Sequence, residues 1–121
     1  MEKKVLVTWL DSLVEERYPQ VRGALSKKFE NGSKELVQGF CPLGVICELS
    51  QLGTWEVHNY SNKLSYLSCT NYLPKEVLEW AKISKKEYDT IMPFIFALND
   101  GAKVSQKEIG LILRRKYVKY L

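Results

Sequence analysis

The feature that most constrains the fold is a segment in the middle of the chain that is apolar on nearly every side. It reads Phe40-Cys41-Pro42-Leu43-Gly44-Val45-Ile46-Cys47-Glu48-Leu49. Pro42 suits the first position of a helix, where its missing N–H costs no hydrogen bond. We predict a helix from Pro42 to about Leu52, ended by Gly53. Because a helix that is hydrophobic all round is buried, the remaining elements must pack around this one.

Length and composition indicate an ordinary folded domain. The chain has 121 residues, of which 45% are hydrophobic and 26% charged. This is enough to bury a core without a metal or a disulfide. The longest apolar runs, such as Phe94 to Leu98, are too short to cross a bilayer, and the first residues lack the features of a signal peptide. An odd number of cysteines, Cys41, Cys47 and Cys69, favours free thiols. We therefore expect a cytoplasmic protein that does not bind to membranes.

Several further segments carry helical signals. Residues 2–17 repeat apolar side chains at the spacing of one buried helix face, and Pro19 is expected to end that helix. Capping-box patterns open two later helices, at Ser84-Lys85-Lys86-Glu87 and at Ser105-Gln106-Lys107-Glu108. Pro93 is expected to interrupt or kink the first of them.

Two segments predict β-structure: residues 20–39 are expected to be extended or to form a β-hairpin, and residues 55–67 alternate in the manner of a short hairpin. Asn31-Gly32 is a strong turn signal, and residues 55–58 and 64–67 predict a second hairpin that turns at 59–63. We therefore predict a single α+β domain over residues 1–121, dominated by helices, with one or two short β-hairpins. The residues expected to be buried in its core are Leu10, Leu13, Val45, Ile46, Val77, Trp80, Ile95, Ile109 and Ile112.

Cys41 is the most reactive side chain that the sequence offers. It lies just before a predicted helix, where the macrodipole lowers a thiol pKa, and His58 and Asn99 would complete a Cys-His-Asn arrangement. The alternative is that Cys41 is a small buried hydrophobe, as most free cysteines are. We favour the alternative and predict no catalytic residue. Cys41 and Cys47 would point about 120° apart on a helix, so we also predict no metal site and no cofactor.

Positive charge is concentrated at the end of the chain. The formal net charge is +4, and residues 102–121 carry six basic residues against one acid. Arg114, Arg115, Lys116 and Lys119, with Tyr117 and Tyr120 between them, would contact phosphates and stack on bases in a nucleic-acid complex. Basic residues near a helix C-terminus are also what the macrodipole favours in any protein.

The order of several short motifs resembles a family of small proteins encoded mostly by bacteriophages and prophages. The motifs stand here as Trp9, Gln20-Val21-Arg22-Gly23-Ala24-Leu25, Phe40-Cys41-Pro42-Leu43-Gly44-Val45-Ile46-Cys47-Glu48, Trp55, Leu73-Pro74-Lys75-Glu76-Val77-Leu78-Glu79-Trp80, Leu98-Asn99-Asp100 and Glu108-Ile109. Pro42 stands where the family often has a second cysteine, which weakens any mechanism using adjacent thiols. The resemblance covers nearly the whole chain and implies a viral accessory protein more than a particular reaction.

We expect such a protein to counteract bacterial defence by sequestering a nucleotide-like anionic signal without catalysis. The alternatives are an inhibitor that binds a host defence protein and a nucleic-acid-binding protein that uses the basic C-terminal helix; self-association stays open. Aromatic side chains suit a base-bearing ligand, and backbone N–H groups at a helix start suit phosphate. The expected ligand-binding residues are Arg22, Gly23, Cys41, Leu43, Trp55, Tyr66, Asn99 and Asp100.

Overall fold

The computed structural model of the chain describes residues 1–57 and 61–121. Within them the chain forms five α-helices and four strands. The helices are α1 (Lys3–Val14), α2 (Pro42–Ser50), α3 (Lys75–Ala81), α4 (Lys85–Phe96) and α5 (Gln106–Lys116); the strands are β1 (Ser26–Glu30), β2 (Leu36–Phe40), β3 (Trp55–Val57) and β4 (Lys63–Tyr66). One turn of π-helix, η1 (Ala97–Gly101), follows α4, and a 3-10 turn, η2 (Val118–Tyr120), follows α5. The expected α+β class is confirmed.

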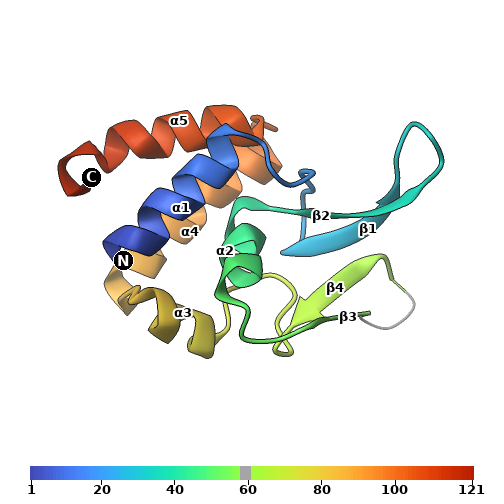
Figure 1. Cartoon of the computed structure of the whole chain (residues 1–121), viewed down its shortest axis with the longest axis horizontal. Helices are drawn as coiled ribbons and strands as arrows, with labels where there is room; N and C mark the ends of the chain where they lie inside the picture. Colours follow the sequence, from blue (N-terminus) through green and yellow to red (C-terminus); the bar gives the residue numbers. More distant parts are fainter. Residues whose placement is uncertain (58–60) are drawn as a thin grey trace.

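The helices gather at one end of the molecule and the sheet lies at the other, with α2 between them (Figure 1). Both chain termini lie at the helical end, far from the β1–β2 hairpin (Figure 1). The Trp9 indole N–H donates to the Pro42 carbonyl at 2.8 Å and so joins α1 to the start of α2. Seven of the nine residues expected in the core are buried, while Trp80 and Ile112 are partly buried.

Two helices end earlier than their sequences predict. The first helix was expected over residues 2–17, but α1 stops at Val14, and Glu16 adopts a φ of 51°. Gln51, not Gly53, takes the left-handed conformation at the end of α2. The N–H of Gly53 instead donates to the Tyr66 hydroxyl at 2.6 Å. A hydroxyl from the distant strand β4 therefore accepts the backbone N–H of Gly53. This N–H has a partner without being part of the helix, so α2 ends before the glycine.

The first capping box is confirmed, because Ser84 and Glu87 exchange both hydrogen bonds at the start of α4. A capping box consists of two hydrogen bonds. At the start of α5 one of them is formed, because the Ser105 hydroxyl accepts the N–H of Glu108 at 3.2 Å. Of the two effects expected of Pro93, the interruption is wrong, since α4 continues through Pro93 to Phe96. Burial of neighbouring Ile91 and Ile95, at 3% and 0% exposed, holds the helix in place despite one missing N–H.

The two predicted hairpins form and then join into one antiparallel sheet of order β2-β1-β4-β3. The turn of the second hairpin falls partly on residues 58–60, outside the described part of the chain. The strand register pairs Ser26 with both Phe40 and Leu64, so the side chains of these three residues lie on the same face of the sheet. We call this the inner face, and it packs toward α2. Lys27 and the residues paired with it, Gly39 and Lys63, lie on the opposite face, which we call the lysine face.

Candidate functional site

The structure brings together two of the segments expected to line a ligand site. The Arg22 side chain donates from Nε to the Asn99 carbonyl at 2.7 Å and from Nη2 to the Lys103 carbonyl at 3.0 Å. The N–H of Gly23 donates to Asp100 Oδ1 at 3.0 Å. Arg22 thus satisfies the Asn99 carbonyl of η1 and the Lys103 carbonyl just after it, and these two bonds use two of its five N–H donors.

Asn99 lies at the centre of this contact and is 0% exposed. Its Nδ2 donates to the Val21 carbonyl at 3.1 Å and to Asp100 Oδ1 at 2.9 Å. Its Oδ1 accepts from Gln20 Nε2 at 2.7 Å. Because Asn99 is fully buried and every polar side-chain atom has a partner, this cluster is a joint between the helices and the sheet.

Cys41 and Leu43, also expected at the site, are buried at the start of α2, at 3% and 0% exposed. Cys41 Sγ accepts the N–H of Gly44 at 3.4 Å and caps the helix. Burial raises the pKa of the Cys41 thiol to about 12, so the thiol is protonated at neutral pH and a poor nucleophile. His58, the base of the alternative catalytic arrangement, lies outside the described residues.

Trp55 and Tyr66 contact each other on the inner face, with ring centroids 4.7 Å apart. Phe40 packs against Trp55 at 5.6 Å, and Tyr18 extends the row at 5.2 Å from Phe40. Tyr66 is 1% exposed, and Trp55 donates from Nε1 to Glu48 at 2.7 Å. These rings are therefore packed mainly against the protein.

The four basic residues near the C-terminus do not share one surface. Arg114 forms an ion pair with Asp11 of α1 at 2.8 Å. Lys116 Nζ lies 5.1 Å from the centre of the Phe94 ring of α4. Lys119 covers its own neighbour Tyr120 at 5.3 Å, and Arg115 is exposed. Arg114 is therefore held toward α1 and Lys116 toward α4.

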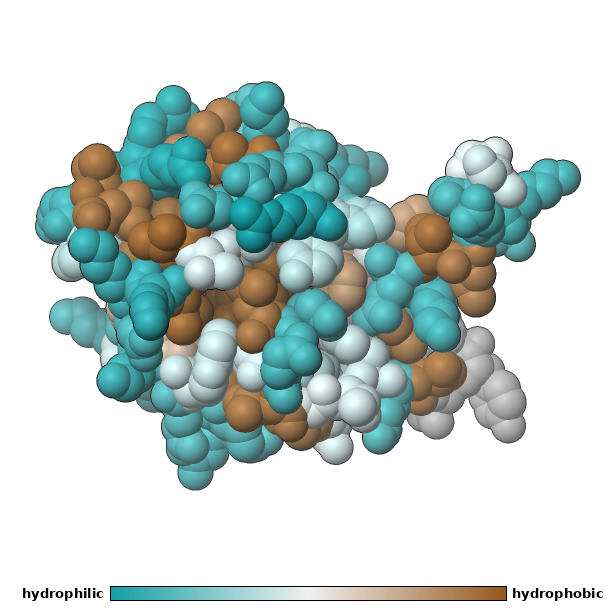
Figure 2. All heavy atoms as spheres, viewed as in Figure 1, coloured by the Kyte–Doolittle hydropathy of each residue, from teal (hydrophilic) through white to brown (hydrophobic). Residues whose placement is uncertain are grey.

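Two adjoining hollows at this end of the molecule form what we call the tyrosine groove. One hollow, of about 350 Å³, is lined by Met1, Leu6, Glu87, Ile91, Tyr117 and Tyr120. The other, of about 300 Å³, is lined by Lys86, Glu87, Thr90, Lys116, Tyr117, Lys119 and Tyr120. The first is mainly apolar, and the second carries three ammonium groups. Apolar and hydrophilic atoms also lie side by side on the surface near both termini (Figure 2).

The carboxylate of the tyrosine groove is already neutralised. Glu87 Oε2 forms an ion pair with the Met1 ammonium at 2.7 Å, and its Oε1 accepts the N–H of Ser84 at 3.1 Å. Burial opposes ionisation of Glu87, but these contacts outweigh it and lower its pKa. Within residues 1–57 and 61–121, no ion pair involves Lys86, Lys116 or Lys119. The lysine end of the groove therefore keeps its positive charge.

A family model described as a domain of unknown function (DUF8296) matches residues 1–114. The chain belongs to this family. No curated protein and no solved structure matches the chain. The family match includes α1, α4 and most of α5, but it ends before Lys116, Tyr117, Lys119 and Tyr120 of the tyrosine groove.

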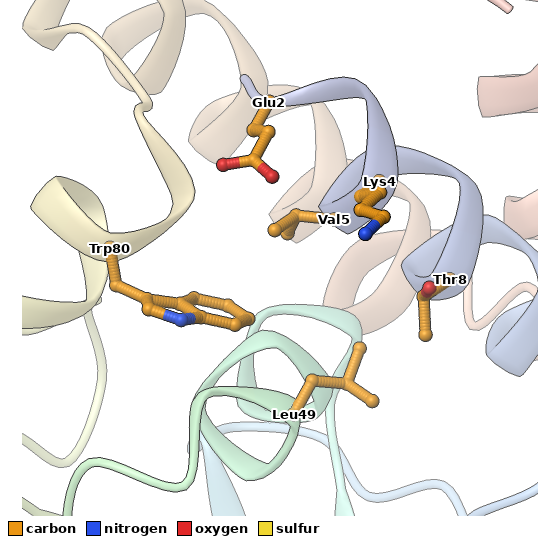
Figure 3. Close-up of a pocket in the computed structure, with 6 residues that line it drawn as sticks. All are labelled: Glu2, Lys4, Val5, Thr8, Leu49 and Trp80. Atoms are coloured by element: carbon orange, nitrogen blue, oxygen red, sulfur yellow. The ribbon is translucent and has the colours of Figure 1, made fainter.

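A separate hollow of about 300 Å³ lies between α1, α2 and α3 (Figure 3). The Trp80 indole reaches across it toward Leu49, and Val5 forms part of its wall (Figure 3). Its charged lining residues are Glu2 and Lys4, of opposite sign. This hollow is therefore suited to apolar contact rather than to an anion.

The sequence pointed to only one wall of the tyrosine groove. Tyr117 and Tyr120, interleaved with Lys116 and Lys119, were identified as groups able to stack and to bind phosphate. Lys86 stands in the sequence only as part of a capping box, Leu6 belongs to the apolar face of the first helix, and Thr90 and Ile91 carry no functional signal. No local pattern could have found them, because they come from helices that meet the C-terminal turn only in the folded chain.

Neither a metal centre nor a membrane-spanning element was found in the described residues. No group of three or more His, Cys, Asp or Glu side chains there is arranged to hold a metal ion. No helix there is long and apolar enough to cross a membrane. The three cysteines are free thiols.

Proposed function

We propose that the protein binds a nucleotide-like anionic small molecule in the tyrosine groove and releases it unchanged. One observation carries this proposal: two adjoining hollows join an apolar end walled by two tyrosines to an end with three lysines that form no ion pair in the described part of the chain. A nucleotide has the same division into a planar ring and a charged phosphate. The groove thus offers the chemistry expected of the ligand site, at a different place from the Arg22–Asn99 cluster.

The lysine end would hold the phosphates. Lys86 approaches from the first turn of α4, while Lys116 and Lys119 approach from the end of α5 and from η2. Ammonium groups form charge-assisted hydrogen bonds with phosphate oxygens, which are stronger than neutral ones. The Thr90 hydroxyl at the same end already donates to the Lys86 carbonyl at 3.0 Å, so its oxygen remains able only to accept from the ligand.

The apolar end would hold the base. Tyr120 is 57% exposed, and its ring centre lies 6.1 Å from that of Tyr117, with the two planes at 51°. A base can therefore stack on one ring and meet the other with its edge, the arrangement that aromatic pairs prefer. Leu6 and Ile91 close this end with apolar surface, and the hollow is within the usual size range of small-molecule pockets.

The biological role that we propose is that of a bacteriophage accessory protein. The resemblance to small phage and prophage proteins supports a role in the host cytoplasm, where the protein would sequester a nucleotide signal of bacterial defence. Sequestration needs binding only, which agrees with a groove whose carboxylate is committed to an ion pair and with a Cys41 thiol that stays protonated.

The test is calorimetry with a panel of cyclic and ADP-ribose-type nucleotides. Lys86→Gln should weaken binding about tenfold or more, since hydrogen bonds to charged groups contribute about 1.5–3 kcal/mol. Tyr120→Ala should weaken it by a similar factor through lost stacking. Lys85→Gln is the matched control, because Lys85 is the neighbouring residue but pairs with Asp89 at 3.1 Å. The nucleotide should be recovered intact by chromatography.

Other outcomes would replace the proposal. Failure of every nucleotide to bind, or equal losses in Lys85→Gln and Lys86→Gln, would reject the groove as a nucleotide site. Affinity for single-stranded nucleic acid that falls steeply with salt and depends on the exposed Arg115 would favour the nucleic-acid alternative. A stable complex with one host protein, unaffected by either groove variant, would favour the inhibitor alternative.

A further inference from the structure

We infer that the lysine face of the sheet carries a second anion site, built on Lys27 and Lys63 and specific for a phosphate group. The register of β1 and β4 sets these two residues directly opposite each other. Directly opposed residues on neighbouring antiparallel strands have Cβ atoms about 5 Å apart. Both lysines are partly buried, whereas the next residue along β1, Lys28, is exposed.

Neither lysine is neutralised by an ion pair in the described part of the chain; the carboxylate on the same face, Glu56, is exposed and lies opposite Ser65. Asp100 reaches the adjoining Gly23, but its Oδ1 accepts from the Gly23 N–H and from Asn99. Like charges placed directly opposite on two strands repel and destabilise the sheet. A dianion bound between the two ammonium groups would turn this repulsion into attraction.

The backbone beside Lys27 fixes where its ammonium group lies. Lys27 Nζ lies 3.4 Å from the point that a Cβ would occupy at Gly23. Gly23 has a φ of 81°, a conformation that favours glycine, and the absence of a side chain there lets the Lys27 ammonium group lie close to the backbone. Ser65 follows Lys63 on the same face, and its hydroxyl makes only a long bond of 3.5 Å to the Glu56 carbonyl. Ser65 is 9% exposed, so its hydroxyl would meet an oxyanion only at the edge of the site.

These groups suit a tetrahedral oxyanion with two charges, either free inorganic phosphate or a phosphomonoester carried by a larger molecule. Strands β1 and β4, which carry the site, lie at the sheet end of the molecule, while both termini, which contribute Met1 and Tyr120 to the tyrosine groove, lie at the helical end (Figure 1). It is therefore a separate site and does not depend on the function proposed for the groove.

The experiment compares thermal unfolding in sodium phosphate and in sodium chloride of the same ionic strength, with affinity measured by phosphate titration in NMR spectra. Phosphate should raise the melting temperature of the wild type above its value in chloride. Lys27→Gln and Lys63→Gln should each weaken phosphate binding about tenfold. In chloride, neither variant should be less stable than the wild type, because each removes a repulsion.

Lys28→Gln is the matched control, since this lysine is adjacent in sequence but on the inner face of the same strand. It should leave phosphate binding unchanged. Titration with phosphoserine separates the two sources of the group: binding equal to that of free phosphate indicates recognition of the phosphate alone, and tighter binding indicates a carrier molecule. Identical phosphate effects in the wild type and all three variants, or no effect of phosphate on the wild type, would overturn the inference.

Discussion

Gly44→Ala should destabilise the protein, although the same change usually stabilises a helix. Gly44 lies in the first turn of α2, and a Cβ there would lie 1.9 Å from the Leu25 carbonyl oxygen and 2.8 Å from the Leu25 carbonyl carbon. Both are backbone atoms, so no side-chain rotation relieves the overlap. To reach ordinary contact, α2 must move away from Leu25 by more than 1 Å, which is a large shift in a close-packed interior.

The magnitude follows from three contributions. Overpacking of a core costs about 1–3 kcal/mol and occasionally more, and the severe overlap with backbone favours the upper end. Moving α2 also weakens the bond from the Cys41 N–H to the Leu25 carbonyl, now 3.0 Å, worth about 1 kcal/mol. The higher helix propensity of alanine than of glycine offsets about 1 kcal/mol of this loss. The expected net loss is about 3 kcal/mol, or roughly 12 °C in melting temperature for a chain of this size.

Urea and thermal unfolding followed by circular dichroism would measure this loss, with two other glycines as graded controls. A Cβ at Gly110 would lie 2.8 Å from Val14 Cγ2 and 2.9 Å from Leu13 Cβ, so Gly110→Ala should cost less than Gly44→Ala. A Cβ at Gly32 meets nothing within 4 Å, and Gly32→Ala should change stability by less than about 0.5 kcal/mol. A Gly44→Ala protein as stable as the wild type would refute the reasoning.

Two further predictions concern buried and paired groups. Cys41→Ala should lower the unfolding free energy by about 1–2 kcal/mol, because the helix cap and some buried volume are lost. Calorimetry should show unchanged ligand affinity. Complete loss of binding by a variant that still folds would instead indicate a chemical role for the thiol. Glu87 has a lowered pKa in the folded state, so its stabilising contribution is present above its ordinary pKa of 4.5 and is lost as pH falls below it. Glu87→Gln should therefore be less stable than the wild type at neutral pH and approach it in acid, as unfolding curves at several pH values would show; a constant difference would contradict this.

Local signals in the sequence were enough for most of the secondary structure. Pro42 begins α2 as predicted, Ser84 and Glu87 cap α4 within one turn, and the two hairpins form where turns were expected. Each of these interactions joins residues close together in the chain, so the residue types alone carry the information. The apolar stretch around Val45 is likewise buried because a helix without a polar face has no stable place at the surface.

Only the tertiary structure decided how these elements meet. The pairing of Lys27 with Lys63 joins two hairpins into one sheet, and nothing in either hairpin specifies that partner. The sequence around Arg22 does not indicate that its guanidinium group donates to the carbonyls of Asn99 and Lys103. The tyrosine groove needs Lys86 and Tyr120 on adjoining walls, although the two are more than thirty residues apart. Contacts of this kind depend on the packing of whole helices and strands, which patterns of a few residues do not encode.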